Sequence, residues 1–146
     1  MIDNGNGTVT DETTGLMWQQ VTPEKVMIWD QATAYCRELQ LSGYADWRLP
    51  TIHELNKIVD YNRFEPAIDN RYFINTAASW YWSSNTYVNF TSRAWGVYFG
   101  NGSVNYGSKN HAGYVRAVRG TAWNQSAKAA RIHDLLAKWK NRVWRL

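Results

Sequence analysis

The chain has 146 residues and a mass of 16.9 kDa, which is the size of one domain. Apolar residues make up 45% of it and charged residues 19%, and this balance excludes a disordered or fibrous chain. The single cysteine, Cys36, excludes an internal disulfide framework and a multi-cysteine zinc site. The fold must therefore be stabilised by packing.

Charge is divided unevenly along the chain, whose net charge is +4. Residues 1–120 carry ten Lys and Arg against eleven Asp and Glu, whereas residues 121–146 carry six against Asp134 alone. The sequence predicts a domain at 1–120, which is not expected to bind nucleic acid, and a basic amphipathic helix at 121–146. We expect this helix to pack on the domain, on a second copy or on a partner protein, with a membrane surface as the remaining alternative.

The sequence contains no apolar run of about 18 residues or more, so no transmembrane segment is predicted. Residues 1–8 are mostly polar and rich in glycine, which is unlike a signal peptide. These features favour a cytoplasmic or virion-borne protein over a classically secreted one.

A β-hairpin is predicted first along the chain. Turn-forming residues at 3–7 lead to a short strand at 8–10, and Gly15 precedes a second strand at 16–18. The oxygen-rich stretch 3–7 also resembles part of a calcium loop, although the closing glutamate of an EF-hand is missing. A polar turn is the favoured interpretation, and calcium binding is the alternative.

The next predicted element is a helix. Thr22, Pro23 and Glu24 have the pattern of a helix start, and Ser42 with Gly43 ends the helix. Cys36 is interpreted as a small buried hydrophobe rather than a reactive thiol, because no His or second Cys is near it in the sequence. The apolar stripe of this helix consists of Val26, Trp29, Ala32, Cys36 and Leu39.

A second helix is predicted after the extended segment 45–50, which ends in a proline. Thr51 and Glu54 have the spacing of a capping box, and the helix continues to about Tyr61. His53 is interpreted as solvent-facing, because no partner occurs at the spacing of metal ligands. The residues that face the core are Leu55, Ile58 and Val59.

Short aromatic and β-branched runs follow, separated by Asn, Ser, Thr and Gly. They lie at 80–84, 93–99, 102–106 and 113–120, and they predict an antiparallel meander of four strands. The clearest tight turn is at 100–102. Because two helices precede this sheet, the predicted fold class is α+β.

No catalytic function is predicted. The sequence lacks the motifs of serine hydrolases, zinc proteases, P-loop enzymes and dinucleotide-binding enzymes. His53, His111 and His133 fall in three different predicted elements without a paired nucleophile. We therefore expect a protein that is not an enzyme, with no catalytic residue, no metal site and no cofactor.

The composition of residues 85–111 is unusual. Tyr, Asn, Ser and Gly dominate this stretch, and binding loops favour these residues because tyrosine offers a large rigid contact and the small residues offer adaptable hydrogen bonds. The same residues also form turns and fill sheets. Composition alone leaves a binding surface and a purely structural role as equal alternatives.

Four groups of residues occur in an order that resembles a known family. They are 3–11 with 14–18, 47–51 with Glu54 and Leu55, 81–84, and 114–120. In this order they are similar to the C-terminal domain of Legionella collagen-like adhesins, over residues 3–120. That family belongs to the C-type-lectin-like fold, which also includes formylglycine-generating enzymes and the variable proteins of diversity-generating retroelements.

The resemblance implies a C-type-lectin-like fold in which two helices pack on an antiparallel sheet. The helix at 121–146 is then an addition beyond the family's usual end at Gly120. In retroelement-diversified members, asparagine and tyrosine codons vary in the segment before the terminal Val-Arg-Gly-like stretch, which corresponds to 85–111 here. The ligand-binding residues that this implies are Asn85, Tyr87, Asn89, Phe90, Asn101, Ser103, Asn105, Tyr106, Ser108, Lys109, Asn110 and His111.

Two functions fit these features. The first is a non-enzymatic module that binds a protein or carbohydrate through a variable Tyr/Asn/Ser-rich surface, as in retroelement variable proteins. The alternative is a bacterial or phage adhesin domain that binds polysaccharide or glycosaminoglycan, with Arg93 and Lys109 pairing with acidic groups. The lone Cys36 departs from the cysteine pair of formylglycine-generating enzymes, and the adhesins' collagen-like repeats are absent from this chain.

Overall fold

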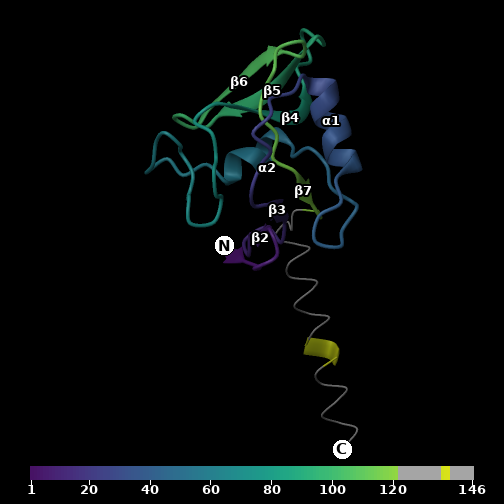
Figure 1. Cartoon of the computed structure of the whole chain (residues 1–146), viewed down its shortest axis with the longest axis vertical. Coiled ribbons are helices and arrows are strands. Elements are labelled where there is room, and N and C mark those ends of the chain that lie inside the picture. The colour runs from purple at the N-terminus through teal and green to yellow at the C-terminus, as the bar shows by residue number, and fades with distance from the viewer. Residues whose placement is uncertain (122–135, 139–146) are drawn as a thin grey trace, which may run out of the picture.

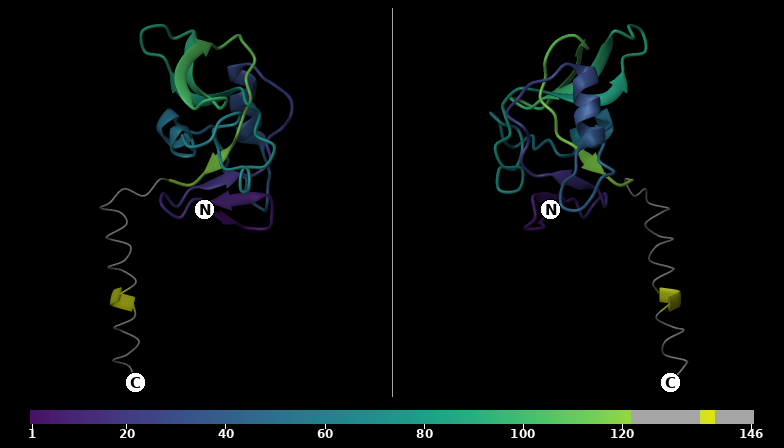
Figure 2. Two further views of the ribbon diagram at one scale, coloured as in Figure 1. Left: turned by 90° about the vertical axis from the view of Figure 1, so that its left-hand side faces the viewer. Right: turned by 45° about the vertical axis from the view of Figure 1, so that its right-hand side comes forward.

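Two antiparallel sheets and two helices make up the part of the chain that the computed structural model describes, residues 1–121 and 136–138 (Figure 1). The helices are α1 (Trp29–Glu38) and α2 (Ile52–Lys57). One sheet has the order β1 (Ile2–Asp3), β2 (Thr8–Thr10), β3 (Met17–Gln19) and β7 (Val118–Arg119). The other consists of β4 (Trp80–Thr86), β5 (Arg93–Tyr98) and β6 (Ser103–Ser108). The two sheets lie at opposite ends of this part, with α2 between them (Figures 1 and 2).

The predicted hairpin at the N-terminus is confirmed. Strands β2 and β3 pair antiparallel, with Val9 opposite Trp18, and both side chains are buried. The turn closes through a hydrogen bond of 2.8 Å from the Gly15 amide to the Asp11 carbonyl. Gly15 has a positive φ of 76°, which glycine adopts without a steric penalty.

The predicted meander of four strands is wrong in its last strand. Strands β4, β5 and β6 form the meander, and the turn at 100–102 joins β5 to β6 as expected. β7, however, pairs with β3 in the other sheet. Residues 113–117 reach it by passing β4, where the Trp82 amide donates to the Tyr114 carbonyl at 3.0 Å. The pattern of 113–120 indicates extended backbone but carries no information about its partner.

The first helix begins later than predicted, at Trp29 instead of Pro23. Met27 is extended and exchanges two backbone hydrogen bonds of 2.8 Å with Gly113, so the preceding residues cannot be helical. Thr22 is buried, with its hydroxyl 3.5 Å from that of Tyr81, and it is not an N-cap. Val26 is exposed, contrary to the predicted stripe. The helix also ends earlier than predicted, at Glu38, with Ala32 and Cys36 fully buried in it.

The capping box of α2 is confirmed. The Thr51 hydroxyl accepts from the Glu54 amide, and the Glu54 carboxylate accepts from the Thr51 amide at 2.8 Å. The helix ends at Lys57, about one turn earlier than predicted. His53 is exposed, as expected. Arg48 donates two hydrogen bonds of 2.8 Å to Glu54 and one of 2.7 Å to the Gly120 carbonyl, so this network ties α2 to the end of the domain.

Hydrogen bonds of buried polar groups stabilise the core in addition to apolar packing. Arg116 is fully buried and donates to the carbonyls of Gln19 and Gln20 and to the Thr76 hydroxyl, at 2.6 to 2.7 Å. Burial lowers the pKa of Arg116 to about 10. The indole of Trp82 donates to the Met27 carbonyl at 2.9 Å. These bonds join segments that are far apart in the sequence and hold the frame that carries β4, β5 and β6.

The predicted C-terminal helix lies outside the described residues, apart from a helical stretch at 136–138. Among the described helices, none has the length and apolar character needed to span a bilayer.

Candidate functional site

The two faces of the sheet β4-β5-β6 have different roles. Side chains alternate along a strand, and Trp95 lies opposite Tyr106 while Gly96 lies opposite Asn105. On the Gly96 side, the Trp80 ring packs so closely that a Cβ at Gly96 would collide with it. Ala94 on the Gly96 side and Val97 on the Trp95 side are both fully buried, so each face packs in part against the body of the domain, and the Trp95 side also carries a cluster of aromatic rings.

This cluster, with one arginine, forms what we call the aromatic face: Tyr87, Phe90, Arg93, Trp95 and Tyr106. The rings of Tyr87 and Tyr106 stack with centroids 4.1 Å apart and an interplanar angle of 9°. Trp95 lies 5.4 Å from each of them at nearly a right angle. Phe90 lies 6.0 Å from Tyr87. Such stacked and edge-on pairs stabilise one another beyond their buried area.

The aromatic face is accessible. Phe90 is 60% exposed and Tyr106 is 36% exposed, and Tyr87 and Trp95 are half-buried. Two aliphatic neighbours, Val88 and Val104, are exposed as well. Exposed apolar side chains that gather on one surface mark interaction sites, whereas isolated ones do not.

Backbone hydrogen bonds hold the loop that carries half of this face. The Tyr87 amide donates to the Arg93 carbonyl at 2.8 Å, and the Arg93 amide donates to the Phe90 carbonyl at 2.9 Å. The Arg93 guanidinium lies 5.5 Å from the Phe90 ring and 5.6 Å from the Tyr106 ring. The rings are thus ordered before any ligand arrives, which reduces the entropy lost on binding.

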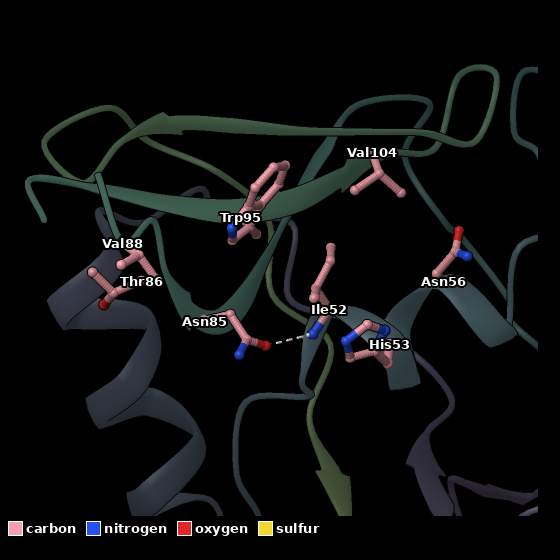
Figure 3. A pocket seen from close by; sticks show the side chains of 8 residues that line it. All are labelled: Ile52, His53, Asn56, Asn85, Thr86, Val88, Trp95 and Val104. Carbon is pink, nitrogen blue, oxygen red and sulfur yellow. Dashed lines mark hydrogen bonds between the residues drawn. The ribbon is translucent and has the colours of Figure 1, made fainter. Parts of the chain in front are cut away.

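A pocket of about 440 Å³ adjoins the aromatic face, between α2 and the sheet (Figure 3). Its lining comprises Ile52, His53, Asn56, Asn85, Thr86, Val88, Trp95 and Val104. Trp95 belongs both to this pocket and to the aromatic face. The Asn85 Oδ1 accepts a hydrogen bond of 2.8 Å from the Ile52 amide, so this predicted ligand-binding residue also anchors the start of α2.

The structure brings some of the predicted site residues together and separates others. Tyr87, Phe90 and Tyr106 meet on the aromatic face, where Asn89 lies near the Tyr87 hydroxyl at 3.5 Å. Another group of predicted site residues lines a second pocket of about 330 Å³, which is also lined by two tryptophans. The predicted residues that line it are Asn105, Tyr106, Ser108 and His111.

Several predicted site residues use their side chains in local hydrogen bonds to the backbone. Asn101 accepts from the Ser103 amide at 3.0 Å, and Asn105 accepts from the Tyr106 amide at 2.8 Å. Ser108 accepts from the Asn110 amide at 3.3 Å. These bonds match the structural alternative for Asn and Ser in this stretch, while the aromatic residues of the same stretch stay accessible.

Lys109 and Arg93 contact different rings. The Lys109 ammonium lies 4.1 Å from the Trp29 ring of α1 and donates to the Thr86 hydroxyl at 2.9 Å. Arg93 instead contacts Phe90 and Tyr106. The two cations that were expected to pair with acidic groups therefore belong to different surroundings.

The oxygen atoms of the N-terminal stretch serve the turn. Asp3 accepts from the Gly5 amide at 2.9 Å, and Asn6 accepts from the amide and the hydroxyl of Thr8. In residues 1–121 and 136–138, no three His, Cys, Asp or Glu side chains are grouped as metal ligands. Cys36 is fully buried, in agreement with its interpretation as a packed hydrophobe, and burial raises the pKa of its thiol to about 12.

Sequence reasoning missed part of the site. It did not assign Trp95, although the alternation of Arg93, Trp95 and Val97 along one strand indicates that these residues share a face. It also missed Ile52 and Asn56, which reach the pocket from α2. No local pattern places α2 beside β4 and β5, so only the tertiary structure could add these residues.

A rigid α+β domain with a preordered, accessible aromatic face has the features of a binding module. The family of the Lcl C-terminal domain matches residues 7–119, and the chain belongs to this family. This confirms the resemblance found in the sequence motifs, and the family is consistent with a non-enzymatic binding module. No curated protein matches the chain.

Proposed function

We propose that this protein is a non-enzymatic binding module of C-type-lectin-like fold that captures a macromolecular ligand on its aromatic face. The observation that supports this is the stacked pair Tyr87 and Tyr106, packed at a right angle on Trp95 and accessible from outside. Rigid aromatic anchors of this kind dominate binding energy in protein interfaces.

The chemistry of the face supports binding rather than catalysis. Its side chains supply ring surface, phenol hydroxyls and one guanidinium. None of its five residues forms a nucleophile–base pair, which is the arrangement that covalent or acid–base catalysis requires.

A matched pair of variants tests this function. The wild-type domain is first screened against a displayed library of random peptides and an array of neutral and sulfated oligosaccharides. The affinity of each probe that binds is then measured for the variants Phe90→Ala and Tyr106→Ala. Each variant should weaken binding by about tenfold or more, because each removes an anchor. The control is Phe64→Ala, which removes a ring that is 76% exposed on a different loop. Equal losses in the control and the test variants would contradict the proposal.

A more specific form of the proposal is that a diversity-generating retroelement changes the codons of the residues on the aromatic face. The segment that carries the face coincides with the stretch rich in Asn and Tyr at 85–111. The coding DNA tests it: a nearby repeat that is nearly identical and differs only at adenines supports diversification, and a unique segment argues against it.

A second candidate is an adhesin domain that binds acidic polysaccharide. The observation in its favour is Arg93, which places a cation beside two rings of the face. Binding of heparin through this cation should weaken as ionic strength rises, whereas binding to aromatic anchors should depend little on salt. Titration of heparin binding against sodium chloride, with Arg93→Gln beside the wild type, separates the two candidates.

A further inference from the structure

The pocket beside the aromatic face has an apolar wall. Ile52 of α2 and Val104 of β6 line it on one side of Trp95, and Val88 lines it on the other (Figure 3). Val104 is 42% exposed and Val88 is 86% exposed, so both side chains offer surface that a ligand could bury. The volume of about 440 Å³ is within the range of small-ligand pockets.

Besides the exposed His53, the polar residues of this pocket are Asn56, Asn85 and Thr86, and each of their side chains already accepts one hydrogen bond. Asn85 Oδ1 accepts from the Ile52 amide, Asn56 Oδ1 accepts from the Tyr61 hydroxyl at 2.8 Å, and Thr86 Oγ1 accepts from Lys109. Their hydrogens have no acceptor among the described residues. The hydrogens of the two amide groups and of the hydroxyl are therefore all available to donate to a ligand, and each oxygen keeps one lone pair.

Charge is missing from the lining. None of the lining residues is Lys, Arg, Asp or Glu. A cationic ligand group would lose its hydration here without gaining a counter-charge, which is unfavourable. The free amide and hydroxyl hydrogens of the lining favour a ligand that offers an uncharged carbonyl oxygen.

We infer that this pocket binds the acetamido group of an N-acetylated sugar, with the sugar chain continuing over the aromatic face. The carbonyl oxygen of the group accepts from Asn56 or Asn85, and its methyl group packs on the aliphatic wall. The apolar side of the sugar ring packs on Trp95. This inference rests on the proposed function, since it assigns a ligand class to the same surface.

The test compares two trisaccharides that differ in the acetamido group. Triacetylchitotriose and cellotriose are titrated into the labelled domain, and indole and Asn side-chain signals are followed by NMR. Triacetylchitotriose should bind at least about tenfold more tightly and shift the Trp95 indole signal. Equal binding of the two trisaccharides, or no binding of either, would overturn the inference.

Matched variants place the binding in the pocket. Asn56→Asp keeps an oxygen for the Tyr61 hydroxyl but replaces the amide donors, and it should weaken triacetylchitotriose binding by about fivefold or more. The control is Asn70→Asp, which makes the same change at an exposed residue outside this pocket. Equal effects of the two variants would place the sugar elsewhere.

Failure of the inference is distinguishable from failure of the proposed function. If a library peptide loses binding in Phe90→Ala and Tyr106→Ala while neither trisaccharide binds, the aromatic face is a binding surface but its ligand is a protein. If no probe responds to those variants more than to Phe64→Ala, the proposed function itself fails.

Discussion

At the scale of single residues, polar and ionisable side chains buried in the core contrast with apolar side chains exposed at the surface. Arg116 and Cys36 are fully buried, and both have pKa values shifted by burial. Phe90 and Val88 are mostly exposed although they are apolar. Buried charge and exposed apolar surface both cost free energy. A residue in either situation therefore indicates a structural or interaction role that offsets this cost.

Arg116 should be a large single contributor to stability. Arg116→Met leaves the carbonyls of Gln19 and Gln20 and the Thr76 hydroxyl without their donors, and each buried unsatisfied group costs about 1–3 kcal/mol. We expect the free energy of unfolding to fall by about 3 kcal/mol or more in urea titrations. Arg37→Met, at an exposed position of α1, is the control and should change it by less than about 0.5 kcal/mol.

Cys36 should be protected from thiol reagents. Burial raises the pKa of its thiol to about 12, and the reactive species is the thiolate. At about pH 8, a mass-detected alkylating reagent should therefore label the folded protein far more slowly than the protein in urea. Rapid labelling of the folded protein would place Cys36 at an accessible position and contradict its role in the core.

At the scale of elements, hydrogen bonds between elements position the site. α2 is anchored at its start by Asn85 of β4 and by its own capping box, and this places Ile52 and Asn56 at the pocket. The loop between β4 and β5 is closed by its backbone hydrogen bonds. The pocket therefore exists because α2 is held against the sheet.

Asn85 allows this coupling to be tested. Asn85→Ala leaves the Ile52 amide without its acceptor, so the free energy of unfolding should fall by about 1 kcal/mol. Asn89→Ala, at an exposed position of the loop that follows β4, should leave stability unchanged. Thermal unfolding of the two variants measures the difference, and equal melting temperatures would show that Asn85 is not an anchor.

At the scale of the whole molecule, ion pairs at the surface link segments that are distant in the sequence. Arg119 binds Asp46, and Arg48 binds Glu54 and the Gly120 carbonyl. The last strand, β7, is held in this way against the segment before α2. Two of these contacts, Arg119 with Asp46 and Arg48 with the Gly120 carbonyl, join the end of β7 to a segment in the middle of the sequence.

Stability should decrease in acid. Hydrogen bonds from Arg71 lower the pKa of Asp69 to about 2, and those from Arg119 lower the pKa of Asp46. Burial by itself raises the pKa of Glu54, but hydrogen bonds from Arg48 and Thr51 outweigh it, so that the pKa of Glu54 is lowered as well. Because the unfolded carboxyls bind protons first, their stabilisation is complete above about pH 5 and is lost progressively as pH falls toward about 2.

Urea midpoints measured across this range test the prediction. Asp69→Asn should flatten the acid limb of the profile, whereas Asp30→Asn, at an exposed position of α1, should leave it unchanged. Greater stability at about pH 3 than at about pH 6 would contradict the prediction.

Local patterns predicted the elements whose signals lie within a few residues. The hairpin at 8–18, the capping box of α2 and the three strands of the meander were all recognisable, because turns, caps and alternation are encoded locally. The start of α1 was predicted wrongly, since Met27 is held extended by Gly113. That bond joins residues far apart in the sequence, and no local signal reports it.

The residues and motifs alone were enough to recognise the family and the stretch rich in Tyr and Asn at 85–111. Which residues of that stretch meet depends on the fold: Tyr87 and Tyr106 stack together, whereas the Asn101 side chain serves a turn. The tertiary structure also decided that β7 joins β3 and that α2 completes the pocket. The physical reason is that strand partners and surface neighbours depend on contacts across the chain, which a residue's local sequence does not specify.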